Sequence, residues 1–496
     1  MNIFKDRFSE IKKASEPLYK SPKSVQETIK ILKISESGIF EVADGKYSKT
    51  YRFSDVNYAT RSEDEQESFF QRYCRCLNSF DCTFKITVNN KNKDMDVLRN
   101  EVMLKYRNDG FDKMRESYNR IIKEKILEGR QGIEQERYLT ITIERKNFEE
   151  AKAQFATIEA STFRSFAELG SKLTPLTGNE RLKILHDYYR LGREDEFNFD
   201  IRQGRITGTD FRNEICNTRI KYHPDYFEDE GKVGRVLFIK KYPTYLSDRF
   251  FTELTFLPVH SVTSVDVVPV PKDLTMKMLQ KKYLGIESDI IKQQRTRNRN
   301  NDFSSDISYA TRQKKKDIEE IMNNVRENDE SLYYVSVTMI VMADDRDELE
   351  SICETVDSIA KGAGCAVDTC MYKQREAVNT TLPIGVRQIE TMRTMLTQSL
   401  AVLMPFNVQE LCDRNGIYYG VNQISKNIIV GNRKKLLNGN GFIFGVSGAG
   451  KSFQAKMEMG SVLLSTDDNV IAVDPMNGAK RSYLKRVGAI FIKLYA

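Results

Sequence analysis

A glycine-rich segment near the end of the sequence most strongly limits what this chain can fold into. Residues 445–452 read Gly-Val-Ser-Gly-Ala-Gly-Lys-Ser, which is a Gly-x4-Gly-Lys-Ser phosphate-binding loop. The apolar residues 442–444 before it predict a short strand, and residues 453–464 after it predict a helix. A helix that begins directly after such a loop directs free N–H groups and its positive dipole end at whatever the loop encloses. The segment therefore predicts a nucleotide-binding α/β unit.

The residue types in the loop suit a nucleoside triphosphate with its metal ion. Glycines permit backbone angles that turn successive N–H groups inward. The lysine is expected to place its ammonium on the β- and γ-phosphates, and the serine hydroxyl is expected to complete a Mg²⁺ shell. The predicted cofactors are thus ATP and Mg²⁺. The candidate binding residues are Gly445, Ser447, Gly448, Ala449, Gly450, Lys451 and Ser452, with Ser452 also the metal ligand. The alternative, a glycine-rich turn that happens to end in Lys-Ser, is disfavoured because the fixed positions coincide by chance in only roughly 1 to 2% of chains of this length.

The sequence after the loop limits what can be predicted about catalysis. Strands are expected at residues 470–473 and 489–494, with a short helix between them, before the sequence ends at Ala496. A RecA-like motor also needs a later strand that ends in the Walker B acidic residues, and no place remains for it. We therefore expect a chain cut through its motor domain, with negligible ATP hydrolysis on its own and no assigned catalytic residue. Asp474, which follows four apolar residues, is the alternative catalytic acid.

Composition and charge exclude several classes of protein. The sequence has 77 Lys and Arg against 70 Asp and Glu, and a net charge of +7 does not by itself identify a nucleic-acid binder. No run approaches the roughly 18 to 20 apolar residues of a membrane span, and no apolar signal-peptide region opens the chain. A cytoplasmic protein is expected. Cys74, Cys76 and Cys82 cluster without a nearby histidine, so reduced thiols are favoured over a metal site.

The predicted fold class is α/β, with an N-terminal α+β region of ferredoxin-like modules before an incomplete RecA-like P-loop NTPase domain. Two strand-helix patterns carry this prediction. In one, a strand at 138–143 precedes a helix capped by Asn147 and closed by Gly170; in the other, a strand at 332–341, a helix at 345–360 and a strand at 366–372 follow each other. The two agree in pattern and not in sequence, so no internal repeat is predicted. The expected segments are a lead-in and hairpin start (1–60), an N-terminal assembly domain (61–290), a basic linker and helix (291–331), a second β-α-β module (332–406) and the truncated NTPase domain (407–496).

Two charged segments leave alternatives open. Residues 97–129 predict two highly charged helices that meet near Asp109-Gly110, the second a surface helix with a narrow apolar stripe that includes Tyr118 and Ile122. Residues 291–316 are polar and basic. Phosphate contacts with nucleic acid, or contact with another partner, would explain that charge, but few aromatic residues are interleaved, so a solvated linker between helix ends is favoured.

Motifs before and within the loop resemble a known family. Residues 382–385 read Leu-Pro-Ile-Gly, Pro405-Phe406 follows, and a Gly-Asn-Arg element at 431–433 leads into Asn-Gly-Phe-x-x-Gly-x-Ser-Gly-x-Gly-Lys-Ser. In these motifs the chain resembles the conjugation ATPases of type IV secretion systems, the VirB/TrbE/CagE group. The resemblance is strong over residues 382–474, and it is weaker, mainly in element order, over 138–372.

The resemblance implies an energy-providing ATPase on the cytoplasmic face of a conjugative DNA/protein transfer apparatus. It implies contact with other components of that apparatus, peripheral contact with membrane proteins at the inner face of the cell membrane, and a motor that works as a homo-oligomer. Gly445, Gly450, Lys451 and Ser452 match the family's Walker A motif. Asp474-Pro475 matches the Asp-Pro of its next strand, but Asn477, Gly478 and Ala479 replace the acidic and aromatic residues that usually follow. No catalytic carboxylate is carried over.

Two other classes of function fit the same loop. A DNA translocase or coupling protein of the P-loop superfamily is one, although membrane-anchored coupling proteins usually open with transmembrane helices. A non-hydrolysing nucleotide-binding or scaffold fragment of the apparatus is the other, because hydrolysis requires an acid to orient water and groups that stabilise developing charge.

Overall fold

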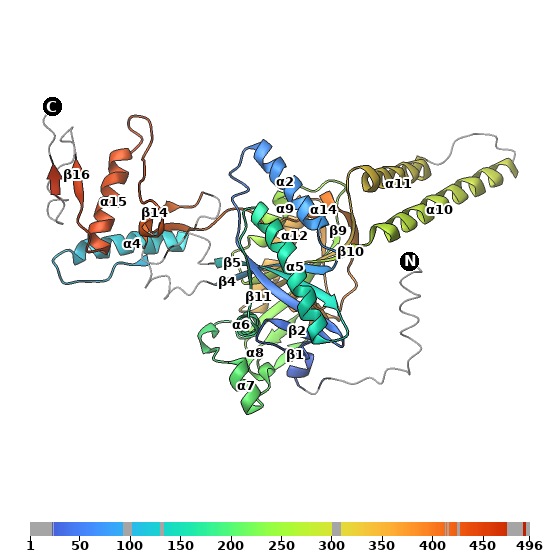
Figure 1. The fold of residues 1–496 in the computed structure, drawn as a ribbon, viewed down its shortest axis with the longest axis horizontal. Helices are drawn as coiled ribbons and strands as arrows, with labels where there is room; N and C mark the ends of the chain where they lie inside the picture. The colour runs from blue at the N-terminus through green and yellow to red at the C-terminus, as the bar shows by residue number, and fades with distance from the viewer. Residues whose placement is uncertain are drawn as a thin grey trace.

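A 13-stranded sheet forms the centre of the molecule (Figure 1). The structure is a computed structural model that describes residues 22, 24–92, 102–128, 133–299, 309–411, 413, 416–423, 427–473 and 490–492. The strands pair in the order β1-β2-β3-β5-β4-β10-β11-β9-β8-β7, with β6 on β3, β12 on β9 and β13 on β11. All of these pairs are antiparallel. The strands are β1 (Lys33–Ile34), β2 (Ile39–Ala43), β3 (Lys46–Phe53), β4 (Thr83–Asn92), β5 (Ile133–Glu144), β6 (Leu173–Pro175), β7 (Ile220–Tyr222), β8 (Phe227–Asp229), β9 (Lys232–Lys241), β10 (Ser261–Val270), β11 (Leu332–Ala343), β12 (Ala366–Thr369) and β13 (Arg393–Leu396).

The sheet consists of two halves with the same order of elements. In the first half, α2 (Glu63–Asn78) connects β3 to β4, and α5 (Phe148–Glu168) connects β5 to β6. In the second half, α9 (Arg249–Thr255) connects β9 to β10, and α12 (Arg346–Gly362) connects β11 to β12. Each half contains a split β-α-β unit, because β3 lies between β5 and β6, and β9 lies between β11 and β12. The structure thus shows a repeat of topology where the sequence analysis predicted none.

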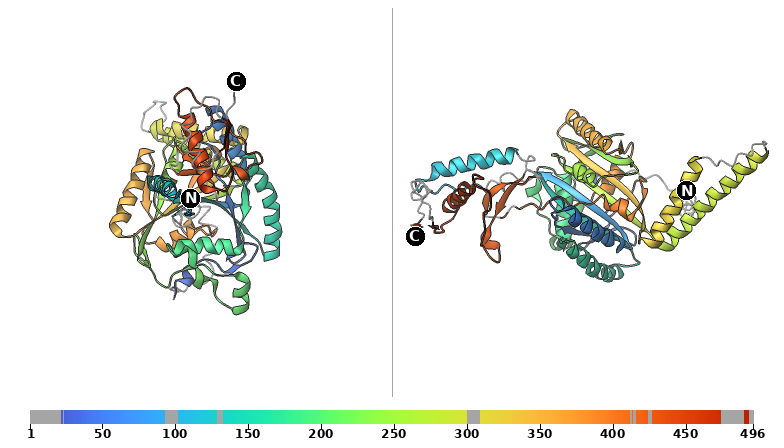
Figure 2. Two further views of the ribbon diagram at one scale, coloured as in Figure 1. Left: turned by 90° about the vertical axis from the view of Figure 1, so that its left-hand side faces the viewer. Right: turned by 90° about the horizontal axis from the view of Figure 1, so that it is seen from above.

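Two layers of helices cover the sheet (Figures 1 and 2). Apolar residues of α2, α5, α9, α12 and α14 (Thr397–Ala401), such as Phe69, Phe155 and Leu349, belong to the larger buried cluster. The second cluster, with Leu182 and Ala377, lies under the helices of the opposite layer. These are α6 (Gly178–Tyr189), α7 (Ile201–Thr207), α8 (Phe211–Ile215) and α13 (Gln374–Thr381), accompanied by the short turns η1 (Gln26–Thr28) and η2 (Glu194–Glu196).

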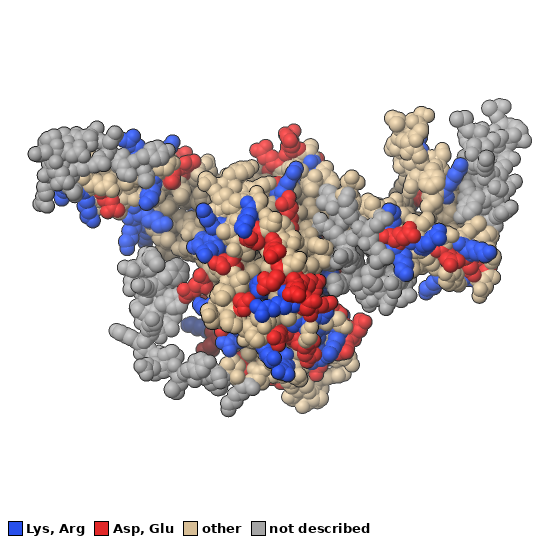
Figure 3. Space-filling model, turned by 180° about the vertical axis from the view of Figure 1, so that it is seen from behind, with Lys and Arg blue, Asp and Glu red and all other residues tan. Residues whose placement is uncertain are grey.

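Each half of the sheet has a helical insertion at the same point in its order of strands. Helix α4 (Asp112–Glu128) lies between β4 and β5, and the helices α10 (Lys272–Arg299) and α11 (Tyr309–Glu327) lie between β10 and β11. The two insertions extend from opposite sides of the central body (Figure 2). Of the segment expected to be a basic linker and helix (291–331), the described residues 291–299 and 309–327 are helical, and acidic and basic side chains are interspersed on α10 and α11 (Figure 3). Lys315 of α11, for example, pairs with Glu287 of α10 at 3.1 Å.

A turn and a helix cap in the first half of the sheet lie where the sequence predicted them. The hairpin predicted at Asp44-Gly45 connects β2 to β3, and Gly45 has a φ of +66°. The Asn147 side chain accepts a hydrogen bond from the Glu150 N–H and caps α5, as expected. Both predictions are confirmed, as is the coarse assignment of a mixed α/β chain.

Two buried cations hold residues 382–385 against the sheet. The Arg181 guanidinium donates to the Ser48 carbonyl at 2.8 Å and to the Pro383 carbonyl at 3.3 Å. The Lys85 ammonium donates to the Leu382 carbonyl at 3.4 Å and to the flanking carbonyls of Thr380 and Val386. Burial lowers the pKa of Arg181 to about 9 and the pKa of Lys85 to about 8. The Leu-Pro-Ile-Gly segment therefore contributes to the core of this part of the chain.

A smaller unit follows the sheet in sequence. It contains the hairpin β14 (Ile417–Val421) and β15 (Ile428–Gly431), the turn η3 (Arg433–Lys435), the helix α15 (Lys451–Ser465), and the strands β16 (Ile471–Val473) and β17 (Ile490–Ile492). The pair β16 and β17 is parallel. In the described part of the chain, no helix is long and apolar enough to cross a membrane.

Candidate nucleotide-binding site

The predicted phosphate loop lies on the surface and leads directly into α15. Gly448 and Gly450 have φ values of +82° and +86°, in the left-handed region that favours glycine. Gly450 is the N-cap residue of the helix. A Cβ on Gly445 would lie 3.2 Å from the Ala449 Cβ, so the loop closes tightly on itself there. Gly448 and Gly450 therefore have backbone angles that favour glycine, and Gly445 lies where a side chain would crowd Ala449.

Lys451 folds back into the loop. Its Nζ donates to the carbonyl oxygens of Gly445 at 2.6 Å and Val446 at 2.8 Å. Ser452 is exposed in the first turn of α15, next to the free N–H groups of the helix N-terminus. Ser447 and Ala449 lie in the turn between Val446 and the start of α15. The structure thus brings together all seven predicted binding residues in one short loop, with the ammonium and the hydroxyl at its helical end.

The strand predicted at residues 442–444 is wrong. The structure has no strand there: the side chains of Phe442 and Phe444 are 83% and 86% exposed, and their rings stack with centroids 5.8 Å apart. A strand requires a neighbouring strand for its backbone hydrogen bonds. The strand that follows α15, β16, pairs with β17 and not with residues 442–444. Asp474, Pro475, Asn477, Gly478 and Ala479 lie outside the described residues, so the strand-end acid stays a prediction.

A polar triad ties the hairpin β14–β15 to the first half of α15. Arg433 pairs with Glu458 of α15 at 2.8 Å and donates from Nε to the Tyr419 hydroxyl at 3.0 Å. The Tyr419 hydroxyl donates in turn to Glu458 at 2.9 Å. Burial, and then the Glu458 carboxylate, raise the pKa of Tyr419. Arg433 also supports the approach to the loop, because a Cβ on Gly441 would lie 2.7 Å from its Nη1.

Sequence reasoning missed this triad. Arg433 was noted only as part of a family-like element, and Tyr419 and Glu458 carry no local signal that links them. They meet because the hairpin folds onto the helix, which is a tertiary contact. Glu458 lies about two turns into α15, too far from the loop in sequence to be linked to it by a local pattern.

The predicted thiols are buried in the core. Cys74 and Cys76 lie in α2, where burial raises the pKa of each thiol to about 12. Within the described residues, no group of three or more His, Cys, Asp or Glu side chains has the geometry to hold a metal ion.

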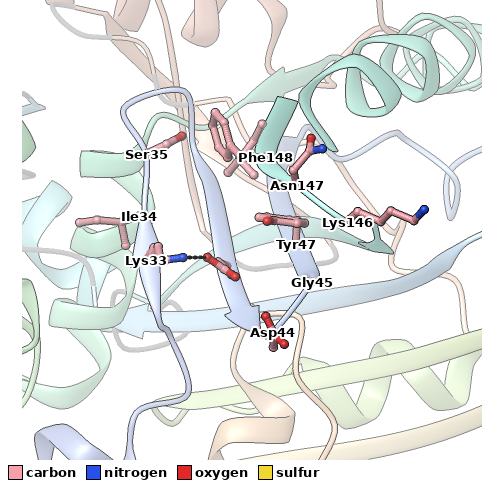
Figure 4. Close-up of a pocket in the computed structure, with 11 residues that line it drawn as sticks. Lys33, Ile34, Ser35, Asp44, Gly45, Tyr47, Lys146, Asn147 and Phe148 are labelled. Atoms are coloured by element: carbon pink, nitrogen blue, oxygen red, sulfur yellow. Dashed lines mark ion pairs between the residues drawn. The ribbon is translucent and has the colours of Figure 1, made fainter. Parts of the chain in front are cut away.

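A cavity of about 520 Å³ opens far from the loop in sequence, beside β1, β2 and the start of α5 (Figure 4). Lys33 and Glu41 form an ion pair of 2.7 Å on its wall. Asn147 also lines the cavity, and its side chain already caps α5. None of the residues that line this cavity belongs to the phosphate loop, so we place the candidate nucleotide site at the loop.

The chain was also compared with known proteins. No protein-family model matches it, and no curated protein matches it.

Proposed function

We propose that this chain binds ATP with Mg²⁺ at residues 445–452. The observation that carries the proposal is the backbone of the loop, in which Gly448 and Gly450 adopt left-handed angles directly before a helix that begins at Lys451. Such a loop presents N–H groups and a positive helix end to an anion. In a complex, the Lys451 ammonium exchanges its two carbonyl partners for β- and γ-phosphate oxygens. Ser452 contributes its hydroxyl to the Mg²⁺ shell.

The wider role is that of the ATP-binding, energy-providing component of a conjugative, type IV secretion transfer apparatus, with ATP hydrolysis carried out by a complete motor domain. Support comes from the resemblance of residues 382–385, Pro405-Phe406 and the loop to the VirB/TrbE/CagE group. The two split β-α-β units fit ferredoxin-like modules for assembly contacts, and the loop with α15 fits the start of a RecA-like motor. The partners in this role are other components of the apparatus, peripheral contacts at the inner face of the cell membrane, and further copies of the chain. No described residue is assigned as the catalytic acid.

Calorimetric titration with ATP, ADP and AMP tests the binding step. We expect Mg-ATP and Mg-ADP to bind and AMP to fail, because the loop contacts the β-phosphate. Lys451→Ala should weaken Mg-ATP binding at least about tenfold, which corresponds to the loss of one charge-assisted contact. Ser452→Ala should chiefly remove the dependence on Mg²⁺.

Lys456→Ala is the matched control, since Lys456 lies on α15 beyond the loop. It should bind Mg-ATP like the wild type. Equal affinity of the Lys451→Ala and wild-type proteins for Mg-ATP would overturn the proposed site. The wider role is tested by DNA transfer from donor cells that carry Lys451→Ala: transfer at the wild-type rate would contradict an energy-providing function.

A further inference from the structure

Helix α4 of the first insertion contacts the far end of the phosphate-loop helix. Arg115 of α4 is only 1% exposed, and its Nε donates to the Leu464 carbonyl in the last turn of α15 at 3.2 Å. The two elements are far apart in sequence and lie side by side in both views of the chain (Figures 1 and 2). The helix that the sequence predicted as a surface helix therefore has a buried contact.

Two carboxylates fix the orientation of the Arg115 guanidinium. Nη1 lies 2.6 Å from Asp109 and 2.8 Å from Asp112, and Nη2 lies 2.5 Å from the second oxygen of Asp109. The hydrogen bond from Arg115 holds the pKa of Asp109 below its usual value. A guanidinium held by carboxylates at both of its Nη atoms has a defined direction for its Nε–H, and that N–H reaches α15.

A second arginine reaches the same helix end. Arg107 donates to the carbonyls of Ser465 at 3.0 Å and Thr466 at 3.4 Å, and it pairs with Asp467 at 2.6 Å. The last carbonyl groups of a helix have no partner within it and carry partial negative charge. Two guanidinium groups from the α4 segment thus satisfy the C-terminal end of α15.

Apolar contacts complete this interface. Val102 and Ile122 from the insertion are buried against Ile428 and Val430 of the hairpin strand β15. Burial raises the pKa of Tyr118 on α4, and hydrogen bonds with the Tyr418 backbone and the Ser461 side chain of α15 oppose that rise. The α4 segment, the hairpin and the loop helix therefore form one packed unit.

We infer that Arg115 is a positioning residue for the nucleotide site. It holds α15 at the end opposite Lys451 and Ser452, and a helix of 15 residues is a rod of roughly 22 Å that transmits a tilt along its length. Because α4 connects β4 to β5, the same contact joins the phosphate loop to the centre of the large sheet. This inference rests on the proposed function of the loop.

Hydrogen exchange and Mg-ATP titration of the full chain test the inference together. In Arg115→Ala without nucleotide, amides at residues 460–466 should exchange faster than in the wild type. The Kd for Mg-ATP should rise about tenfold, as expected when a helix end loses a buried charge contact. Mg-ATP should slow exchange in residues 102–125 of the wild type and leave that segment unchanged in Arg115→Ala. A residue with a purely structural role would not give this last difference.

Three further variants sharpen the result. Arg120→Ala, at an exposed position of the same helix, should match the wild type in both measurements. Arg115→Lys keeps the charge without the planar fork, so its Kd should lie between those of wild type and Arg115→Ala. If Arg115→Ala does not fold, Arg107→Ala tests the same helix end, because its side chain is 35% exposed and its loss leaves the apolar contacts in place.

Unchanged exchange at residues 460–466 in Arg115→Ala would overturn the contact, whatever the nucleotide result. Faster exchange with an unchanged Kd would overturn the positioning role. A wild type that fails to bind Mg-ATP would instead overturn the proposed function, and the nucleotide-free exchange would still decide whether Arg115 holds α15.

Discussion

The hydroxyls of Thr87 and Ser264 lie 2.8 Å apart at the centre of the large sheet. Thr87 on β4 is directly opposite Ser264 on β10, and Phe84 pairs with Val267 as Asn90 pairs with Ser261. The two residues occupy the same place in their halves, because Thr87 lies opposite Tyr138 of β5 and Ser264 lies opposite Thr338 of β11, the equivalent strand of the other half. The local twofold relation between the halves therefore passes through these two side chains.

Removing the Ser264 hydroxyl should destabilise the fold. Ser264 is fully buried and donates to the Thr381 carbonyl at 2.5 Å, so Ser264→Ala leaves that carbonyl and the Thr87 hydroxyl without this partner. We expect a loss of about 1–3 kcal/mol in the free energy of unfolding. Chemical denaturation measures it. Ser37→Ala is the control, because it removes one hydroxyl of an exposed pair and should change stability by less than about 0.5 kcal/mol. Equal effects would contradict the buried network.

Gly38 and Gly170 separate backbone strain from close packing. Both have left-handed backbone angles, with φ values of +79° and +80°. A Cβ on Gly38 would lie 2.0 Å from the Leu176 carbonyl oxygen, whereas a Cβ on Gly170 has no neighbour within 4 Å. Gly170→Ala should cost about 1–2 kcal/mol from strain alone. Gly38→Ala should cost about 1–3 kcal/mol more, because the backbone must move. Urea unfolding measures both losses. Equal losses of stability in the two variants would show that the backbone near Leu176 moves away from the new Cβ at little cost.

Features set by a few neighbouring residues could be predicted from the sequence. The turn at Asp44-Gly45, the Asn147 cap of α5 and the glycine positions of the phosphate loop all depend on local backbone preferences. The same local reasoning failed at residues 442–444, where three apolar residues indicated a strand. Whether such a segment pairs depends on a neighbouring strand, and sequence periodicity carries no information about that neighbour.

Long-range contacts could not be predicted in this way. The pairing of β4 with β10 brings together residues that are far apart in sequence, such as Thr87 and Ser264. The two halves of the sheet share an order of elements without a shared sequence pattern. The role of Arg115 was also hidden, because its partner on α15 is a backbone carbonyl, which any residue provides. The sequence therefore predicted the residues of the phosphate loop, but it did not predict the contacts that hold the helix α15 in place.

His260 should make stability depend on pH in mildly acidic solution. Burial, with a smaller effect of Lys232, lowers the pKa of His260 to about 4. The unfolded chain has a histidine pKa of about 6.5 and so binds more protons than the folded chain between these values. Stability from this group is fully present above pH ~6.5 and is lost as the pH falls through ~4, by about 3 kcal/mol in all.

The variant His260→Leu isolates this effect. Among the described residues neither ring nitrogen of His260 has a hydrogen-bond partner, so the substitution removes the titration without breaking a hydrogen bond. Denaturation at a series of pH values should give curves for wild type and variant that diverge below pH ~6.5, with the wild type losing more stability. Parallel curves would show that His260 becomes solvated before it protonates.

Nucleotide should stabilise the wild type more than it stabilises Lys451→Ala. The Lys451 ammonium donates to the loop carbonyls of Gly445 and Val446 at the surface, so its removal should change stability without ligand by no more than about 0.5 kcal/mol. Mg-ATP at a hundredfold excess over its Kd should add about 2.7 kcal/mol to the wild type if it binds only the folded state. Thermal unfolding of both proteins with and without Mg-ATP measures this increment. Equal shifts in the two proteins would mean that Lys451 does not contact phosphate, and a variant that is unfolded without nucleotide would mean that the residue is needed for the fold itself.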